Sequence, residues 1–386
     1  MKFKTKVLHS HKIEDQHGAL NIPIYQSSTY DYQDFESGRA RFSGQEQGFI
    51  YSRMANPTVN ALEQTIAKIE GAEQALVVSS GMAALSSIFI ALCHQGDHVA
   101  VVEPVYGGSS AMLSQTLTRF GVNVHRYYSD EDLLERIHPQ TKIILFESIS
   151  NPTVAVNDFR KVKKAAEKVD AITVCDNTLY SPYLFRPLEH GMDLVMHSAT
   201  KYLSGHGDII AGVVAGSSSL MEQVRTVGLK HVGASIGPQD AYSLSRGLRT
   251  LPLRMEAHQK GAMHVAEFLE NHPKVERVHY SGLKSSPYHQ VASESVGHFG
   301  GLVSFELVGG EAACQKVLDN LNLFTQAVSL GDLESLACHP ATTTHAAVSP
   351  ELRHEAGISD SMIRLSIGVE APEDLINDLQ QALDLV

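Results

Sequence analysis

DLVMHSATKYLSGH, residues 193–206, is a short apolar run that ends in hydroxyls, an amine and a glycine-containing turn. The run predicts a buried strand, and Lys201 follows the end of that strand. A lysine in this position can lose its charge through desolvation and form a Schiff base with an aldehyde. Ser198 and Thr200 alternate along the chain, so they share a face and offer hydroxyls to a phosphate. A lone lysine after a buried strand is more commonly a surface residue. Other motifs along the chain are therefore needed to distinguish a surface lysine from one that forms a Schiff base.

Short apolar runs recur on both sides of this stretch and predict a sheet. The strand candidates are residues 75–78, 98–102, 143–146, 172–175, 194–197 and 209–214. Between several of them lie segments with helical periodicity, such as 82–93 and 158–169. This alternation is typical of a mostly parallel sheet that helices cover on both faces. The sequence therefore predicts an α/β domain over residues 56–250.

The two ends of the chain follow other patterns. Residues 1–55 contain scattered Gly, Gln, Ser and Tyr with little periodicity, which favours an extended arm lying on another surface. Beyond residue 250, a long helical segment, short strands and a closing amphipathic helix predict a smaller α+β domain over residues 251–386. A chain of 386 residues exceeds what one core usually fills, so two domains with an arm are expected.

The charge balance limits the kind of partner. Lysine and arginine total 31 and aspartate and glutamate total 43, which gives a net charge of −12. An acidic protein is poorly suited to nucleic acid or an anionic membrane surface, so we expect a small-molecule partner. The first residues are basic, but no apolar run follows them, and no later run is long enough to span a bilayer. A soluble protein is therefore expected.

Cysteine and histidine positions indicate neither disulfides nor a metal. The four cysteines are far apart and form no CxxC pair: Cys93, Cys175, Cys314 and Cys338. A reducing cytoplasm is the simplest setting for such a chain. The close histidine pairs are His9 with His11 and His339 with His345, and neither has the helical spacing of a metal motif. We predict no metal site.

Two further strand ends carry residues suited to one cofactor. Gly81 and Met82 follow the strand at 75–78 and open a helix, whose backbone amides attract a phosphate. Asp176 follows the strand at 172–175, at the edge where open α/β sheets bind ligands. A carboxylate there can keep a pyridine nitrogen protonated, which makes the ring an electron sink. Together with Lys201, these residues predict a site for pyridoxal phosphate.

With these strand ends in this order, the whole chain resembles the Cys/Met metabolism family of pyridoxal-phosphate enzymes. The resemblance runs from PIYQSSTY at residues 23–30 to RLSIGVE at residues 364–370. The family has fold type I of the pyridoxal-phosphate-dependent transferases and includes cystathionine γ-synthase, cystathionine γ-lyase, cystathionine β-lyase and methionine γ-lyase. The resemblance implies a mostly parallel large domain and a smaller α+β C-terminal domain.

The resemblance also implies which residues hold the cofactor. Lys201 matches the lysine of the Schiff base, and Asp176 the partner of the pyridine nitrogen. The phosphate cup matches Gly81, Met82, Ser198 and Thr200. Tyr51 and Arg53 match a pair that reaches the phosphate of a neighbouring subunit. Tyr106 matches the tyrosine that stacks on the cofactor ring.

The family pattern assigns the substrate and the reaction as well. Asn151, Ser329 and Arg364 match the group that receives the substrate carboxylate, and a guanidinium suits this task because it can donate two parallel hydrogen bonds. Lys201 is expected to act as the base and Tyr106 as the acid for the leaving thiol. The implied reaction is γ-elimination from a sulfur amino acid, giving 2-oxobutyrate, ammonia and a thiol.

Four positions bear on which sulfur compound enters. Val328 stands where cystathionine γ-enzymes usually carry a glutamate, which favours a thioether such as methionine. Gly108 replaces a cysteine of the methionine γ-lyases, and His231 after Lys230 replaces an aspartate. Such changes can reorder substrates, since they alter discrimination by about 1 to 3 kcal/mol. We expect a carbon-sulfur γ-lyase of the methionine γ-lyase type with some breadth.

Other functions stay open at this stage. Cystathionine γ-lyase is the first alternative and cystathionine γ-synthase the second. A relative that binds the cofactor without turnover and an aminotransferase on the same fold are further alternatives. Because Tyr51 and Arg53 serve a neighbouring subunit, a dimer is the functional minimum, and the resemblance implies a homotetramer built as a dimer of dimers.

Overall fold

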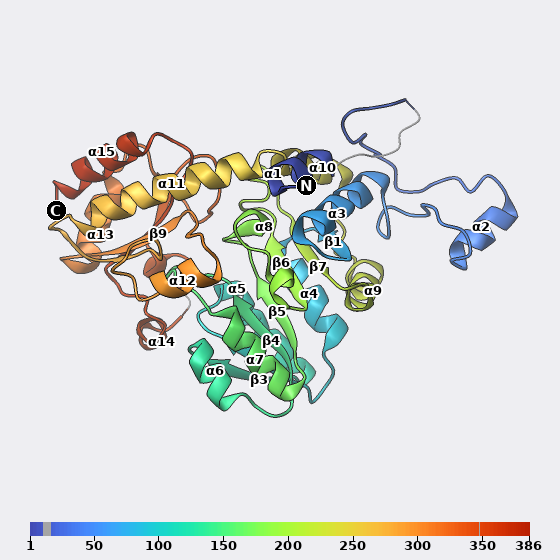
Figure 1. Ribbon diagram of the computed structural model, residues 1–386, viewed down its shortest axis with the longest axis horizontal. Helices are drawn as coiled ribbons and strands as arrows, with labels where there is room; N and C mark the ends of the chain where they lie inside the picture. Colours follow the sequence, from blue (N-terminus) through green and yellow to red (C-terminus); the bar gives the residue numbers. More distant parts are fainter. Residues whose placement is uncertain (11–16, 347) are drawn as a thin grey trace.

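A seven-stranded sheet forms the centre of the molecule (Figure 1). The computed structural model describes residues 1–10, 17–346 and 348–386. The strand order is β1-β7-β6-β5-β4-β2-β3. The strands are β1 (Gln74–Val78), β2 (His98–Val102), β3 (Asn123–Tyr127), β4 (Thr141–Glu147), β5 (Ile172–Asp176), β6 (Leu194–Ser198) and β7 (Gly212–Gly216). Only β7 runs antiparallel to its neighbours in this sheet.

Helices cover both faces of this sheet because its strands are apolar on both sides. Along β1, Ala75 and Val77 pack into one buried cluster and Leu76 and Val78 into the other. The helices of this part are α3 (Pro57–Glu70), α4 (Gly81–Leu92), α5 (Gly107–Ala111), α6 (Asp130–Arg136), α7 (Phe159–Val169), α8 (Ser181–Leu184), α9 (Ser218–Arg225) and α10 (Pro238–Leu248). The π-helical segments are η1 (Met112–Thr116) and η4 (Thr226–Val232), and the 3-10 helices are η2 (Leu117–Phe120) and η3 (Pro187–His190). The α/β class is confirmed.

Two details differ from the sequence prediction. The strand β3 was missed, because it is a partly exposed edge strand with His125 and Arg126 in its middle. The strand expected at residues 209–214 is β7, which begins only at Gly212. Gly212 is needed there, since a Cβ on it would come within 2.0 Å of the Ser80 carbonyl oxygen.

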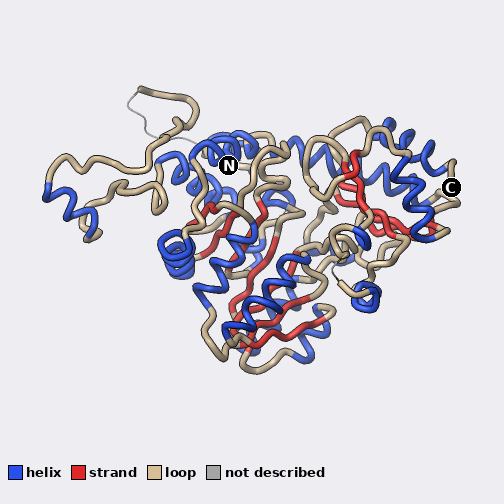
Figure 2. The backbone as a smooth tube through the Cα atoms, turned by 180° about the vertical axis from the view of Figure 1, so that it is seen from behind, coloured by secondary structure: helices blue, strands red, loops and turns tan. Residues whose placement is uncertain are grey.

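The C-terminal part contains a second sheet, separate from the first in Figure 2. Its order is β10-β11-β12-β9-β8, and the strands are β8 (Val275–His279), β9 (Leu302–Leu307), β10 (Thr325–Gln326), β11 (Leu336–Cys338) and β12 (Met362–Ser366). The helices are α11 (Leu251–Glu270), α12 (His289–Ser295), α13 (Gly310–Asp319), α14 (Pro350–Glu355) and α15 (Pro372–Leu383), with the turn η5 (Pro340–Thr342). The boundaries at residues 55 and 250 stay predictions.

The N-terminal part of the chain leaves the body of the molecule. After α1 (Phe3–His9), the segment that carries α2 (Phe35–Phe42) projects well away from the large sheet (Figure 1). Phe35 is 81% exposed and Phe42 is 66% exposed. The projecting arm therefore carries large apolar side chains that the described part of this chain leaves exposed.

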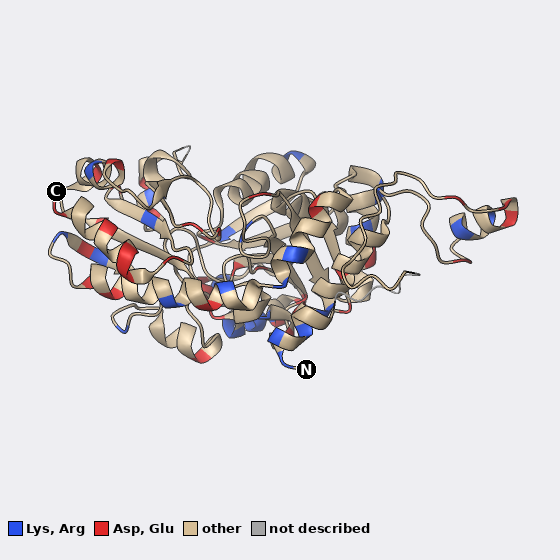
Figure 3. Ribbon diagram, turned by 90° about the horizontal axis from the view of Figure 1, so that it is seen from above, with Lys and Arg blue, Asp and Glu red and all other residues tan. Residues whose placement is uncertain are grey.

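Positively and negatively charged residues are both spread along the chain. The ribbon in Figure 3 shows Lys and Arg positions interspersed with Asp and Glu positions. Within the described ranges, no helix combines the length and the apolar composition that a bilayer crossing requires.

A buried arginine holds the turn that follows β6. Arg254 of α11 is 5% exposed and donates hydrogen bonds to the carbonyls of Tyr202 (2.7 Å) and Gly247 (2.8 Å). Burial lowers the pKa of Arg254 to about 10, so it is still charged at neutral pH. At Gly205, where φ is +69°, a Cβ would collide with the guanidinium. One helix of the C-terminal part therefore fixes the turn that carries Lys201.

We expect the substitution Arg254→Met to lower the free energy of unfolding by about 2 to 3 kcal/mol, because buried carbonyls lose their donor. The matched control is Arg249→Met, since Arg249 is exposed and its guanidinium donates a hydrogen bond to Asn21 Oδ1 at 2.6 Å. The control should change the stability by less than about 0.5 kcal/mol. Urea unfolding of both variants measures the difference, and equal effects would show that Arg254 does not hold the turn.

Candidate active site

A cavity of about 590 Å³ lies at the carboxyl ends of β4, β5 and β6. Residues Val328, Ser329 and Leu330 of the C-terminal part close it from the other side, together with Arg364 of β12. Most predicted site residues line this cavity: Gly81, Met82, Tyr106, Gly108, Asn151, Asp176, Ser198, Thr200, Lys201, Val328, Ser329 and Arg364. Residues from both parts of the chain thus meet in one site.

Lys201 is a partly buried lysine that lines the cavity. Its turn follows β6 directly, and its Nζ donates a hydrogen bond to Ser329 Oγ at 3.0 Å. Burial lowers the pKa of Lys201, and the positive charge of Arg364 lowers it further, while Asp332 opposes both. A lysine in this environment is more readily neutral, which is the form that attacks an aldehyde.

Small residues let the backbone close in around the beginning of α4. Ser80 caps this helix by accepting a hydrogen bond from the Ala83 amide at 3.0 Å. A Cβ on Gly81 would come within 2.9 Å of the Ser198 Cβ, so only glycine lets α4 approach the end of β6 this closely. Thr200 Oγ1 accepts a hydrogen bond from the Ala211 amide at 3.0 Å. The helix N-terminus and these hydroxyls form a cradle suited to a phosphate.

Two carboxyl groups face the cavity from neighbouring strands. Asp176 ends β5 and Glu147 ends β4, and the two residues are paired in register. Asp176 Oδ1 accepts from the Thr178 amide at 3.0 Å, and Glu147 Oε1 accepts from the Tyr106 amide at 2.5 Å. Burial raises the pKa of both, and the charge of Asp176 adds to the increase at Glu147. The pKa of Glu147 is raised further than that of Asp176, so Glu147 takes up a proton more readily than Asp176 does.

Glu147 was not among the site residues predicted from the sequence, although its position at the end of a strand pattern points to the same edge of the sheet. It follows the apolar run at residues 143–146 in the same way that Asp176 follows the run at 172–175. Ile210 was also missed; it lines the cavity and is 67% exposed.

Arg364 presents an unpaired donor inside the cavity. It is 2% exposed at the middle of β12, and its guanidinium donates to Asn151 Oδ1 (3.1 Å) and to the Ser329 carbonyl (2.8 Å). Its buried Nε has no partner among the described residues. An unsatisfied buried donor is costly, so a ligand with an acceptor oxygen, such as a carboxylate, fits this position.

Tyr106 lies at the opening of the cavity. Its side chain is half exposed, and its ring lies directly over Gly108, where a Cβ would come within 2.5 Å of the Tyr106 Cε1. A cysteine at position 108 would therefore displace this ring.

The cavity does not include the predicted residues Tyr51, Arg53, Lys230 and His231. Arg53 donates to the Lys230 carbonyl at 2.9 Å, and its guanidinium lies 5.7 Å from the centre of the Tyr51 ring. These residues form a separate group near η4 on the surface of the chain.

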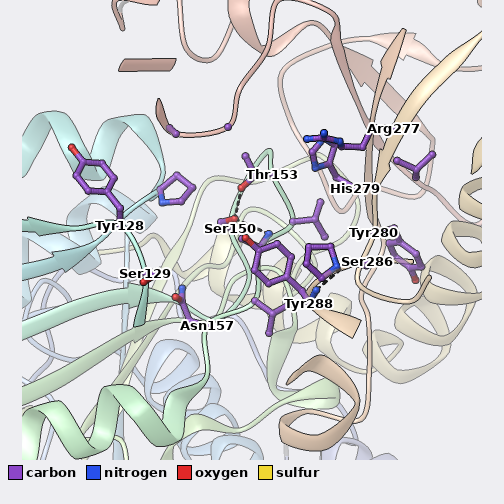
Figure 4. Close-up of a pocket in the computed structure, with 18 of the residues that line it drawn as sticks. Tyr128, Ser129, Ser150, Thr153, Asn157, Arg277, His279, Tyr280, Ser286 and Tyr288 are labelled. Carbon is purple, nitrogen blue, oxygen red and sulfur yellow. Dashed lines mark hydrogen bonds between the residues drawn. The ribbon is translucent and has the colours of Figure 1, made fainter. Parts of the chain in front are cut away.

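A second cavity, of about 740 Å³, lies beside the active-site cavity (Figure 4). The segment 150–153 separates the two cavities, because Asn151 lines the first and Ser150 and Thr153 line the second. The hydroxyl groups of Ser150 and Thr153 are joined by a hydrogen bond of 2.7 Å. None of the cofactor-binding, substrate-binding or specificity residues predicted from the sequence lines this second cavity. The chemistry therefore belongs to the smaller cavity.

The donor set of that smaller cavity fits pyridoxal phosphate. It combines a partly buried amine, a helix N-terminus that Gly81 lets approach Ser198 closely, and a carboxylate at a strand end. The residues expected to hold the cofactor are Lys201, Asp176 and those of the cradle.

Known proteins with similar sequences match this chain over nearly its whole length. An L-methionine gamma-lyase of Pseudomonas putida is 46% identical over 385 residues, covering 99% of this chain and 97% of that one. A cystathionine beta-lyase of Lactococcus lactis subsp. cremoris is 43% identical, covering 99% and 98%.

Solved structures match over the whole chain as well. A putative O-acetylhomoserine (thiol)-lyase of Campylobacter jejuni, whose structure contains a pyridoxyl-lysine, superposes with a TM-score of 0.95 at 36% identity and full coverage of both chains. A cystathionine gamma synthase of Xanthomonas oryzae gives 0.94 at 37% identity, covering 100% of this chain and 98% of that one. The expected type I fold is confirmed. Because the family model for the Cys/Met metabolism PLP-dependent enzymes matches residues 4–384, this chain belongs to that family.

Proposed function

We propose that this protein is a carbon-sulfur γ-lyase that converts L-methionine and related sulfur amino acids to 2-oxobutyrate, ammonia and a thiol. The observation that carries the proposal is Arg364, which lines the same cavity as Lys201 and whose buried Nε has no partner among the described residues. An amino acid bound there by its carboxylate brings its α-carbon to the lysine.

Bound pyridoxal phosphate supplies an electron sink for the charge that develops on the substrate carbons. Asp176 keeps a proton on the pyridine nitrogen. Lys201 removes the proton from the α-carbon and moves protons on the substrate, which its lowered pKa allows. Tyr106 donates a proton to the departing sulfur, and its position at the cavity opening leaves it within reach of the distal end of the substrate.

Asn151 and Ser329 orient Arg364 rather than catalyse. Each accepts one hydrogen bond from the guanidinium, so the remaining donors point in a fixed direction. A carboxylate is held by such a group in one geometry, which leaves the amino-acid side chain free to reach the variable end of the cavity.

The variable end favours an uncharged substrate side chain. Val328 is 60% exposed and lines the cavity together with Ile210, so this end is lined in part by apolar carbon. Relatives named methionine gamma-lyase are 41% to 46% identical to this chain, which supports the same choice. Cystathionine γ-lyase is the alternative and cystathionine γ-synthase the next, because Gly108, Lys230 and His231 depart from the methionine γ-lyase pattern.

We propose a homotetramer built from two dimers. Tyr51 and Arg53 lie outside the cavity of their own chain and follow in sequence the projecting segment that carries the exposed Phe35 and Phe42. An arm of this kind can bring the pair to the phosphate of a neighbouring subunit. We also propose a cytoplasmic location, since the four cysteines are free thiols.

One assay tests the substrate assignment. The purified holoenzyme receives methionine, homocysteine or cystathionine alone, and 2-oxobutyrate, pyruvate and thiol are quantified. We expect 2-oxobutyrate and methanethiol from methionine, with kcat/KM at least equal to that for cystathionine. A large preference for cystathionine would contradict the proposal in favour of the cystathionine γ-lyase, and pyruvate as the main product would indicate β-elimination. Product that forms only when cysteine and an activated homoserine are both present would identify a γ-synthase.

The pKa of Lys201 gives a second prediction. The negative charge of Asp332 raises this pKa, so Asp332→Asn should lower it further and make the neutral amine available at lower pH. The rate at which apoenzyme recovers its bound-cofactor absorbance should then rise with pH through a lower midpoint than in the wild type. Asp319→Asn, a change of the same kind at an exposed site on α13, should leave the midpoint unchanged. An unchanged midpoint in Asp332→Asn would contradict the assigned electrostatics.

A further inference from the structure

Three histidines that are distant in the sequence lie together beside the edge of the large sheet. His98 opens β2, His125 is in the middle of β3, and His138 lies between α6 and β4. One ring nitrogen from each lies within 4.8 Å of the others, and all three side chains are partly buried. None of them lines the active-site cavity, which is at the opposite ends of the strands.

The three rings are arranged as a pair with a third ring over it. His98 Nδ1 and His125 Nε2 are 2.7 Å apart, while the ring centres are 5.0 Å apart and the planes differ by only 11°. These values describe two rings side by side, joined by one shared proton. The His138 ring is parallel to both, with its centre 4.1 Å from that of His98 and 4.6 Å from that of His125.

The surroundings of His125 favour its neutral form. Burial lowers the pKa of His125, and the neighbouring His138 and His98 lower it further when they are charged. Neutral imidazole is the form that binds metal ions. The His125 ring is therefore suited to offer a nitrogen lone pair to an ion.

We propose that His98, His125 and His138 form a binding site for a divalent transition-metal ion of the Zn²⁺ class. A metal ion replaces the proton shared by His98 and His125, and their nitrogens need to separate only slightly, because each Zn–N bond is about 2.0 to 2.1 Å long. His138 supplies the third ligand by turning its ring, which gives up its contact with the Gln140 amide at 3.2 Å. No carboxylate belongs to the set, so nitrogen-preferring ions are selected over Mg²⁺ and Ca²⁺.

Such a site connects three segments that are also held by the sheet and by the Tyr127 hydroxyl, which accepts a hydrogen bond from the His138 amide at 3.0 Å. The ion ties β2 and β3 to the loop before β4, so it stabilises the exposed edge of the sheet without touching the active site. The sequence analysis predicted no metal because it considered only histidines close in sequence, and these three are brought together by the parallel pairing of β2 with β3 and β4.

The holoenzyme, freed of metal by chelation, can be titrated with Zn²⁺ by calorimetry and equilibrium dialysis. We expect a site of one ion per chain that His125→Gln weakens by at least about 100-fold, since losing even a partner of a ligand costs about 10- to 100-fold. The second variant, His138→Gln, should weaken Zn²⁺ binding to the same extent. Position 138 lies outside the strands, so this variant keeps the test valid if His125→Gln folds poorly. His264→Gln changes an exposed histidine of α11 and serves as the matched control.

Two readouts separate a built site from scattered surface binding. Zn²⁺ should raise the melting temperature of the wild type and of His264→Gln but of neither cluster variant. Co²⁺ should give the intense visible absorption of low-coordinate binding only where the cluster is intact. Equal Zn²⁺ affinity in the wild type and both cluster variants, or no site above the level of surface histidines, would overturn the proposal.

Discussion

The removal of the Lys201 amine from water is the constraint on which the rest of the site depends. An exposed lysine is charged at neutral pH and does not attack an aldehyde. Here burial lowers the pKa of Lys201, Arg364 adds to the effect, and Asp332 limits it. Lys201 and Arg364 line the same cavity, so the groups that favour the neutral amine also lie at the site where the family's chemistry takes place.

The enclosure needs both parts of the chain. The large sheet supplies the ends of β4, β5 and β6, but these ends are open until Val328 to Leu330 and Arg364 close over them. Arg254 of α11 joins the two parts by donating hydrogen bonds to the carbonyls of Tyr202, in the turn after β6, and of Gly247. Arg364 and Lys201 are therefore positioned by the same packing, and the proposed roles of the two residues require such a fixed relative position.

The sequence predicted what local patterns can encode. Apolar runs predicted β1, β2, β4, β5 and β6, and the residues after three of them, Gly81, Asp176 and Lys201, do meet in one cavity. The strand β3 was missed because edge strands can be polar, and His125 and Arg126 disguised its pattern. Glu147 was missed because its role appears only when the register sets it beside Asp176. Arg254 and the three histidines of the cluster depend on contacts between distant segments, which no short window of sequence contains.

Borohydride reduction of the holoenzyme followed by peptide mapping tests the central claim most directly. The account predicts one pyridoxyl label per chain, on the ε-nitrogen of Lys201. A label on another lysine, or no label in a protein that contains the cofactor, would contradict it.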